Sequence, residues 1–171
     1  LPGVGAFADA MKGLDDYCLI DALQLYAQNG RPFLGICLGM QMMLSKSEEF
    51  GRHEGLNFIS GNVVQIEPMD LNGYSCKVPH IGWNQLVYPV GKDASCWKDS
   101  ILDGLSELSS VYFVHSFAAL PEDTESRLAD TLYGGRYVSA VIRKGNLFGC
   151  QFHPEKSGPI GLKIIGNFLR L

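Results

Sequence analysis

Residues 35–39 read Gly-Ile-Cys-Leu-Gly, and this segment restricts the local fold more than any other. A short apolar run at residues 32–36 precedes the cysteine, and apolar residues at helical spacing follow it from residue 38 to about residue 46. A sharp turn that lifts a side chain between a strand and a helix needs strained backbone angles, and it leaves room only for small residues two positions to either side. Glycine occupies both positions. The segment therefore predicts an elbow that presents Cys37 as a nucleophile.

The helix expected after Cys37 bears on the chemistry of the thiol. Free amides and positive potential at a helix N-terminus favour a thiolate, and such surroundings lower a cysteine pKa from about 8.5 into the range of roughly 3.5–7.5. We therefore expect a lowered pKa at Cys37. The alternative is a buried core cysteine between two incidental glycines, and the strand before it, the helix after it and a suitable base downstream favour the nucleophile.

A candidate base lies near the other end of the chain, where residues 151–155 read Gln-Phe-His-Pro-Glu. Residues two apart in an extended backbone point the same way, so His153 and Glu155 are expected to share a face. The carboxylate can then accept from one imidazole nitrogen while the other nitrogen addresses a thiol. A histidine beside a glutamate is common on surfaces, but together with the elbow it predicts a triad of Cys37, His153 and Glu155.

The rest of the chain predicts one α/β domain over residues 1–171. We expect an open, mostly parallel, flavodoxin-like sheet flanked by helices, with some antiparallel strands in the second half. The predicted helices cover residues 7–29, 38–46 and 160–171, the last capped by Ser157 or Gly158 with Pro159 at its first position. The predicted strands cover residues 32–36, 62–66, 111–115, 138–142 and 147–152, with a hairpin turn at 143–146, and residues 51–57 and 91–110 are loop-rich.

Composition excludes several classes of function. The formal net charge is −4 and no Lys/Arg cluster occurs, which argues against a nucleic-acid partner. Five widely spaced cysteines without a CxxC pair, and four scattered histidines without HExxH, support no metal site, and no cofactor is expected. No apolar run approaches the roughly 20 residues of a membrane span, and the cysteine pattern suits a reducing compartment, so we expect a cytoplasmic protein.

Longer motifs carry a family resemblance. Residues 35–41 and 151–155 resemble the signature of the class I (triad-type) glutamine amidotransferases. Within that class, residues 1–7 (Leu-Pro-Gly-Val-Gly-Ala-Phe), 79–84 (Pro-His-Ile-Gly-Trp-Asn), 112–116 (Tyr-Phe-Val-His-Ser) and 156–157 (Lys-Ser) resemble the glutaminase subunits of imidazole glycerol phosphate synthase. The match spans nearly the whole chain in order. Family members begin with a further βαβ segment, and because this chain starts at Leu1 without a methionine, we expect an upstream segment to be missing.

The resemblance implies a reaction and a set of site residues. Cys37 would attack the side-chain amide of L-glutamine and expel ammonia, and the thioester left behind would be hydrolysed to glutamate. His153 would move protons and Glu155 would hold its ring. The backbone amides of Val4 and Leu38 would form the oxyanion hole. The residues implied in substrate binding are Gly5, Gln41 and Ser116.

The resemblance also implies a (β/α)8-barrel cyclase partner in a heterodimer, which uses the ammonia to make imidazole glycerol phosphate and AICAR in histidine biosynthesis. The implied contact residues are Pro79, His80, Trp83, Asn84, Tyr112 and Lys156. Trp83 is the candidate anchor, because large aromatic side chains dominate such interfaces. The alternatives are that His80 and His115 are structural, that Trp83 is core, and that Lys156 is a solvated surface charge.

Three other functions remain open at the level of sequence. The chain could serve another synthase, such as those of GMP or carbamoyl phosphate. It could be a free-standing cysteine hydrolase with the same triad, which would work at full rate alone. It could also be a catalytically silent binding domain, in which replacing Cys37 would change nothing.

Overall fold

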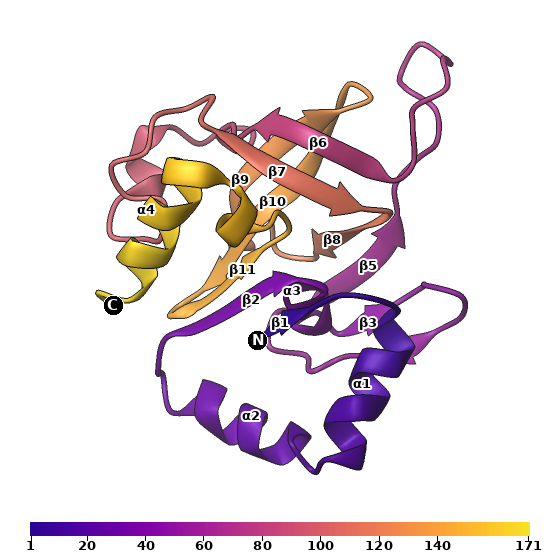
Figure 1. The fold of residues 1–171 in the computed structure, drawn as a ribbon, viewed down its shortest axis with the longest axis vertical. Coiled ribbons are helices and arrows are strands. Elements are labelled where there is room, and N and C mark those ends of the chain that lie inside the picture. The colour runs from indigo at the N-terminus through magenta and orange to yellow at the C-terminus, as the bar shows by residue number, and fades with distance from the viewer.

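A five-stranded sheet runs through the middle of the molecule (Figure 1). One of its strands ends at Cys37. The computed structural model describes all residues 1–171. The strand order is β1 (Pro2–Gly3), β2 (Phe33–Cys37), β11 (Leu147–Cys150), β10 (Arg136–Lys144) and β9 (Arg127–Tyr133). Strands β1, β2 and β11 pair in parallel, whereas β11, β10 and β9 pair antiparallel. The cysteine therefore leaves the sheet from β2, which has a neighbour on each side.

Both faces of this sheet are covered by apolar side chains. Phe33 and Leu34 are consecutive in β2, are both buried, and belong to different core clusters. Helices α1 (Phe7–Asp16) and α2 (Ile20–Gln28) pack on the Phe33 side, and α4 (Gly158–Phe168) packs on the Leu34 side (Figure 1). A strand buried on both faces explains the uninterrupted apolar run before Cys37.

Two smaller sheets complete the fold. One joins β4 (His53–Glu54), β3 (Lys46–Ser47), β5 (Gly61–Gln65) and β8 (Phe117–Pro121), and the other is an antiparallel pair of β6 (His80–Gln85) and β7 (Ser110–His115). Only Ser116 separates β7 from β8, so the chain passes from one sheet to the other at this residue. The α/β class with mixed pairing is as expected, but the antiparallel share is larger than the sequence indicated. No helix has the length and apolar character needed to cross a membrane.

The helix expected over residues 7–29 is two helices, and the one expected over 38–46 is shorter. Cys18 adopts a left-handed φ of 54°, and Leu19 N–H donates to Leu14 C=O while Cys18 N–H donates to Asp15 C=O. These two bonds form the usual helix stop, with cysteine where glycine is common. Helix α3 (Leu38–Met42) ends early because Ser45 N–H donates to Gly61 C=O and the chain enters β3.

Among the strands longer than two residues, three were not predicted, namely β6, β8 and β9. Asp130 and Thr131 are buried in β9 and interrupt its apolar pattern, while Gly82 interrupts that of β6. The predicted strand positions for β2, β5, β7, β10 and β11 agree to within about two residues. The segment expected to be loop-rich at residues 51–57 contains β4, and the one at residues 91–110 contains the short 3-10 helix η1 (Ala94–Trp97). A second short 3-10 helix, η2 (Thr124–Ser126), follows β8. Pro159 lies in the first turn of α4 as expected.

Candidate active site

Cys37 has the backbone conformation that the elbow requires. It is the last residue of β2 and has φ 54° and ψ −113°, a left-handed conformation that side chains other than glycine rarely adopt. A Cβ on Gly35 would lie 2.7 Å from the carbonyl oxygen of Gly39, and a Cβ on Gly39 would lie 1.8 Å from that of Leu1. Both glycines are therefore required by close backbone approach, and the predicted elbow is confirmed.

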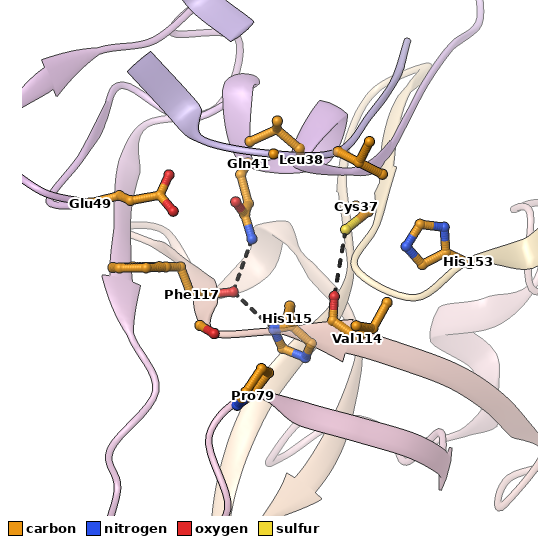
Figure 2. Close-up of a pocket in the computed structure, with 12 residues that line it drawn as sticks. Cys37, Leu38, Gln41, Glu49, Pro79, Val114, His115, Phe117 and His153 are labelled. Carbon is orange, nitrogen blue, oxygen red and sulfur yellow. Dashed lines mark hydrogen bonds between the residues drawn. The ribbon is translucent and has the colours of Figure 1, made fainter. Parts of the chain in front are cut away.

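The elbow opens into a cavity of about 320 Å³ (Figure 2). Cys37 and His153 both line it, although one ends β2 and the other follows β11. The other predicted residues that line the cavity are Val4, Gly5, Leu38, Gln41, Pro79 and Ser116. A cavity of this size lies at the lower end of the range that holds small ligands. The structure thus brings the Cys37 thiol and two imidazoles, those of His115 and His153, to a space suited to a small ligand.

His153 is held on one side and free on the other. Its Nδ1 lies 2.7 Å from Oε1 of Glu155, and its Nε2 is buried without a hydrogen-bond partner in the protein. Figure 2 shows the imidazole beside Cys37 with a ring nitrogen turned towards the sulfur. The expected extended backbone is wrong after His153, because η3 (Pro154–Lys156) is a 3-10 turn. The turn nevertheless brings the Glu155 carboxylate to the ring.

The expected lowering of the Cys37 pKa is wrong in direction. Burial raises the pKa of the thiol and is the largest effect. The Leu38 amide opposes it, the Glu155 carboxylate raises the pKa further, and the Lys156 ammonium has a smaller lowering effect. Helix α3 is only five residues long, which limits the positive potential at its start. The sulfur therefore rests as a thiol, and its attack on a substrate needs a base in reach, a position that His153 occupies.

Val4 and Leu38, the two residues predicted to offer backbone amides, both line the cavity with Cys37. The Leu38 amide is close enough to the Cys37 sulfur to lower its pKa, and Val4 N–H donates to no group in the chain. Gly5 has φ 99°, a conformation in which glycine meets little resistance. Val4 and Gly5 form the loop that joins β1 to α1, so one of the two amides stands on the elbow and the other on a neighbouring turn.

Gln41 is buried at the cavity wall with its donors already used. Its Nε2 donates to the carbonyl oxygen of Phe117 at 2.9 Å and to Oε1 of Gln151 at 3.1 Å, while its own Oε1 accepts no hydrogen bond from the protein. Gln151 in turn donates from Nε2 to the Cys37 sulfur at 3.8 Å. The free carbonyl oxygen of Gln41 can therefore accept from a ligand without loss of a protein contact.

Sequence reasoning did not find five residues of this site, namely Glu49, Val114, His115, Phe117 and Gln151. Glu49 lines the cavity and accepts from the Phe7 amide at 2.6 Å. Val114 offers its carbonyl oxygen to the Cys37 sulfur at 4.0 Å (Figure 2). Phe117 and Val114 contribute through backbone oxygens, which leave no trace in a side-chain pattern. The acidic pair at residues 48–49 after a short strand is the one signal that was present for Glu49.

The expected partner-contact residues divide into surface and interior. Trp83 is 59% exposed and packs edge-on against Tyr112, so it is not a core residue, and Lys156 is exposed. Asn84 is half-buried, and Pro79 lines the cavity. His80 must be corrected, because its side chain is only 3% exposed and offers no surface to a partner.

The remaining cysteines have no common chemistry. All five are free thiols, and no group of three His, Cys, Asp or Glu side chains is arranged to hold a metal ion. Cys150 is fully buried in β11, and burial raises its thiol pKa strongly. Of these thiols, only Cys37 reaches the cavity.

Comparison with known proteins matches the whole chain to one protein family. The family model for glutamine amidotransferase class I matches residues 1–171. The chain is 56% identical to "Imidazole glycerol phosphate synthase subunit HisH 1" of Legionella pneumophila (strain Lens), covering all of this chain and 79% of that protein. It is 45% identical to the HisH subunit of Aquifex aeolicus (strain VF5), with coverages of 99% and 75%.

Solved structures agree on the fold. A crystal structure of a glutamine amidotransferase aligns with a TM-score of 0.62 at 17% identity, over 99% of this chain and 75% of the other. A glutamine amidotransferase from Thermotoga maritima aligns with a TM-score of 0.59 at 18% identity, over 99% of this chain and 60% of the other. At such identities the likeness concerns the fold alone.

Proposed function

Because this chain belongs to the class I glutamine amidotransferase family, we propose that it is the glutaminase subunit of an imidazole glycerol phosphate synthase. It hydrolyses glutamine to glutamate and supplies ammonia for histidine biosynthesis. The observation that carries this function is the meeting of Cys37 and His153 in one cavity, with the Nε2 of His153 unpartnered. We propose that it works in the cytoplasm, because five free cysteines suit a reducing compartment.

The chemistry divides into two acyl-transfer steps. As the Cys37 sulfur attacks the side-chain amide carbon of glutamine, Nε2 of His153 takes the thiol proton. The tetrahedral intermediate collapses with cleavage of the carbon–nitrogen bond, and the imidazolium returns the proton to the departing nitrogen as ammonia. Water, deprotonated by His153, then attacks the thioester, and glutamate and the free thiol are released.

Fixed dipoles meet the charge that develops in these steps. Glu155 accepts from Nδ1–H of His153 and stabilises the imidazolium, as the orienting carboxylate of a triad does. The oxyanion forms next to the amide of Leu38, and the unpaired amide of Val4 supplies the second donor. Loss of one such donor in other hydrolases costs about 10²–10³ in kcat.

The amino-acid end of glutamine is bound at the opposite wall of the cavity. Its ammonium group donates to the free Oε1 of Gln41 and faces the Glu49 carboxylate. Gly5 and Ser116 line the same space and complete the contacts to the main chain of the substrate. A cavity with one carboxylate and one free carbonyl oxygen selects a ligand that carries a positive charge.

Ammonia is mostly protonated at neutral pH, and ammonium is not nucleophilic. A glutaminase of this kind therefore has a partner that consumes the ammonia before it reaches bulk water and is protonated. We take that partner to be a (β/α)8-barrel cyclase bound over Trp83, Tyr112, Asn84 and Lys156. Trp83 is the best candidate for an anchor residue in this group, because its large aromatic side chain is exposed.

Substitution of the nucleophile tests the function. Cys37→Ala in the full-length protein with its partner subunit should lower glutamate release by up to about 10⁶-fold, as triad knockouts do. Cys18→Ser, which changes an exposed thiol of the α1–α2 junction, is the matched control and should keep full activity. Unchanged glutaminase activity in Cys37→Ala would refute the proposal. Full activity without any partner would instead favour a free-standing hydrolase.

A further inference from the structure

Two buried histidines form a hydrogen-bonded chain whose proton positions are fixed by geometry. His115 Nδ1 lies 2.8 Å from the carbonyl oxygen of Phe117, and a carbonyl only accepts, so this nitrogen carries the hydrogen. The Nε2 of the neutral His115 ring then accepts from His80 Nδ1 at 3.1 Å. The remaining His80 Nε2 accepts from the side-chain amide of Asn84 at 3.3 Å. Each ring is therefore the Nδ1–H tautomer.

The surroundings keep these rings neutral and immobile. Both side chains are less than a tenth exposed. Burial lowers the pKa of His80 to about 4 and that of His115 to about 3. The His80 ring is stacked between Tyr133, at 4.0 Å between ring centroids, and Phe113, at 4.7 Å. This stacking resists rotation of the His80 ring, which would exchange its donor and acceptor.

The hydrogen bonds of the histidine pair end on a carbonyl oxygen that also contacts a residue of the candidate site. The Phe117 carbonyl accepts from His115 and from Gln41 Nε2, and Figure 2 shows the two bonds meeting on that one oxygen. The second donor hydrogen of Gln41 is held by Gln151. Because both donor hydrogens are fixed, the orientation of the Gln41 amide is fixed as well, and its free Oε1 has one direction left.

We propose that His80 and His115 are positioning residues for glutamine: as paired Nδ1–H tautomers they fix the Phe117 carbonyl, and through it they aim the free oxygen of Gln41 at the substrate. The inference rests on the proposed function, in which Gln41 binds the ammonium group of glutamine. A purely structural pair would need only its ring stacking. A positioning pair needs a donor at the Nδ1 position of His115, which separates the two roles.

The test compares two substitutions at one position. His115→Leu removes the donor, whereas His115→Asn keeps an amide N–H near the place of Nδ1. In the full-length protein with its partner subunit, His115→Leu should raise KM for glutamine about fivefold to tenfold, as expected for one lost hydrogen bond, and leave kcat within about threefold. His115→Asn should restore KM to within about threefold. His53→Asn, a half-exposed histidine in β4, is the control and should change neither constant.

The outcomes separate this proposal from the function on which it rests. Equal KM values for His115→Leu and His115→Asn, or a loss confined to kcat, would overturn the positioning role while Cys37→Ala still abolishes activity. Retained activity in Cys37→Ala would instead remove the proposed function. Nitrogen-15 NMR of histidine-labelled protein provides a second readout, because it distinguishes imidazole tautomers: Nδ1–H signals assigned to both His80 and His115 support the proposal, and an Nε2–H form of His115 contradicts it.

Discussion

Gln151 donates a hydrogen bond from its side-chain amide to the sulfur of Cys37, and it does so from the segment that also carries His153. A donor directed at the sulfur stabilises the thiolate relative to the thiol. It therefore acts in the same direction as the Leu38 amide and against the burial that raises the Cys37 pKa. Burial nevertheless prevails, because the pKa of the thiol is raised overall.

Removal of this donor should make the thiol harder to ionise. Gln151→Met keeps the size of the side chain but offers no N–H, so we expect the alkylation of Cys37 to shift to higher pH by about 0.5–1 unit. The value of kcat/KM for glutamine should fall about tenfold, since the shift reports the same loss of stabilised negative charge. The measurement is the pH profile of alkylation by iodoacetamide. Ser100→Ala removes a buried hydrogen bond to the Trp97 carbonyl and is the control. An unchanged alkylation profile would show that Gln151 does not act on the sulfur.

The second glycine of the elbow is expected to be more sensitive than its helical position suggests. A Cβ on Gly39 would meet the Leu1 carbonyl at 1.8 Å, and Gly3 in β1 pairs with Cys37 in β2, so backbone must shift. We expect Gly39→Ala to lower the free energy of unfolding by about 3 kcal/mol or more.

Gly13→Ala is the matched control for that prediction. Gly13 lies in α1, and nothing stands within 4 Å of its added Cβ. This change should raise stability by about 0.5–1 kcal/mol, because alanine is the better helix former. Urea unfolding of both variants measures the difference. Equal stabilities would contradict the steric account of the elbow.

The sequence predicted those parts of the site that local sterics determine. Two glycines around Cys37 are required by the elbow itself, so their spacing, together with the strand before the cysteine and the helix after it, predicted the elbow. The contact between His153 and Glu155 was also predicted, although it is made across a 3-10 turn rather than along a strand. The helix stop at Cys18 was missed because a cysteine occupies the left-handed position that glycine usually marks.

What could not be predicted depends on contacts between distant segments. The Phe117 and Val114 oxygens belong to the backbone, so no residue type announces them. The direction of the Cys37 pKa shift was missed for a related reason, since burial of the sulfur results from packing of several elements whereas the helix start is local. Strand β9 was missed because its buried Asp130 pairs with Arg127, and this pairing is invisible in an apolar pattern.

The histidine pair makes stability depend on pH in a defined window. Burial lowers the pKa of His80 to about 4 and of His115 to about 3, both below the ordinary value of 6.5. Between about pH 6.5 and pH 4 the unfolded chain therefore binds protons that the folded protein does not. The free energy of unfolding should be constant above that window with respect to these groups and should fall as pH decreases through it. Burial raises the pKa of Asp130, which has the opposite effect at the acid end.

The slope of this dependence can be measured. Each histidine contributes at most about 1.4 kcal/mol per pH unit, so the pair contributes at most about twice that slope. Urea unfolding at pH 7.5, 6.5 and 5.5 should therefore show a loss of stability that begins below about pH 6.5. His115→Asn removes one titrating ring and should make the curve shallower, which assigns the slope to the pair. A stability that stays level from pH 7.5 to 5.5 would mean that these rings are protonated as readily in the folded protein as in the unfolded chain, which would contradict the lowering of their pKa values by burial.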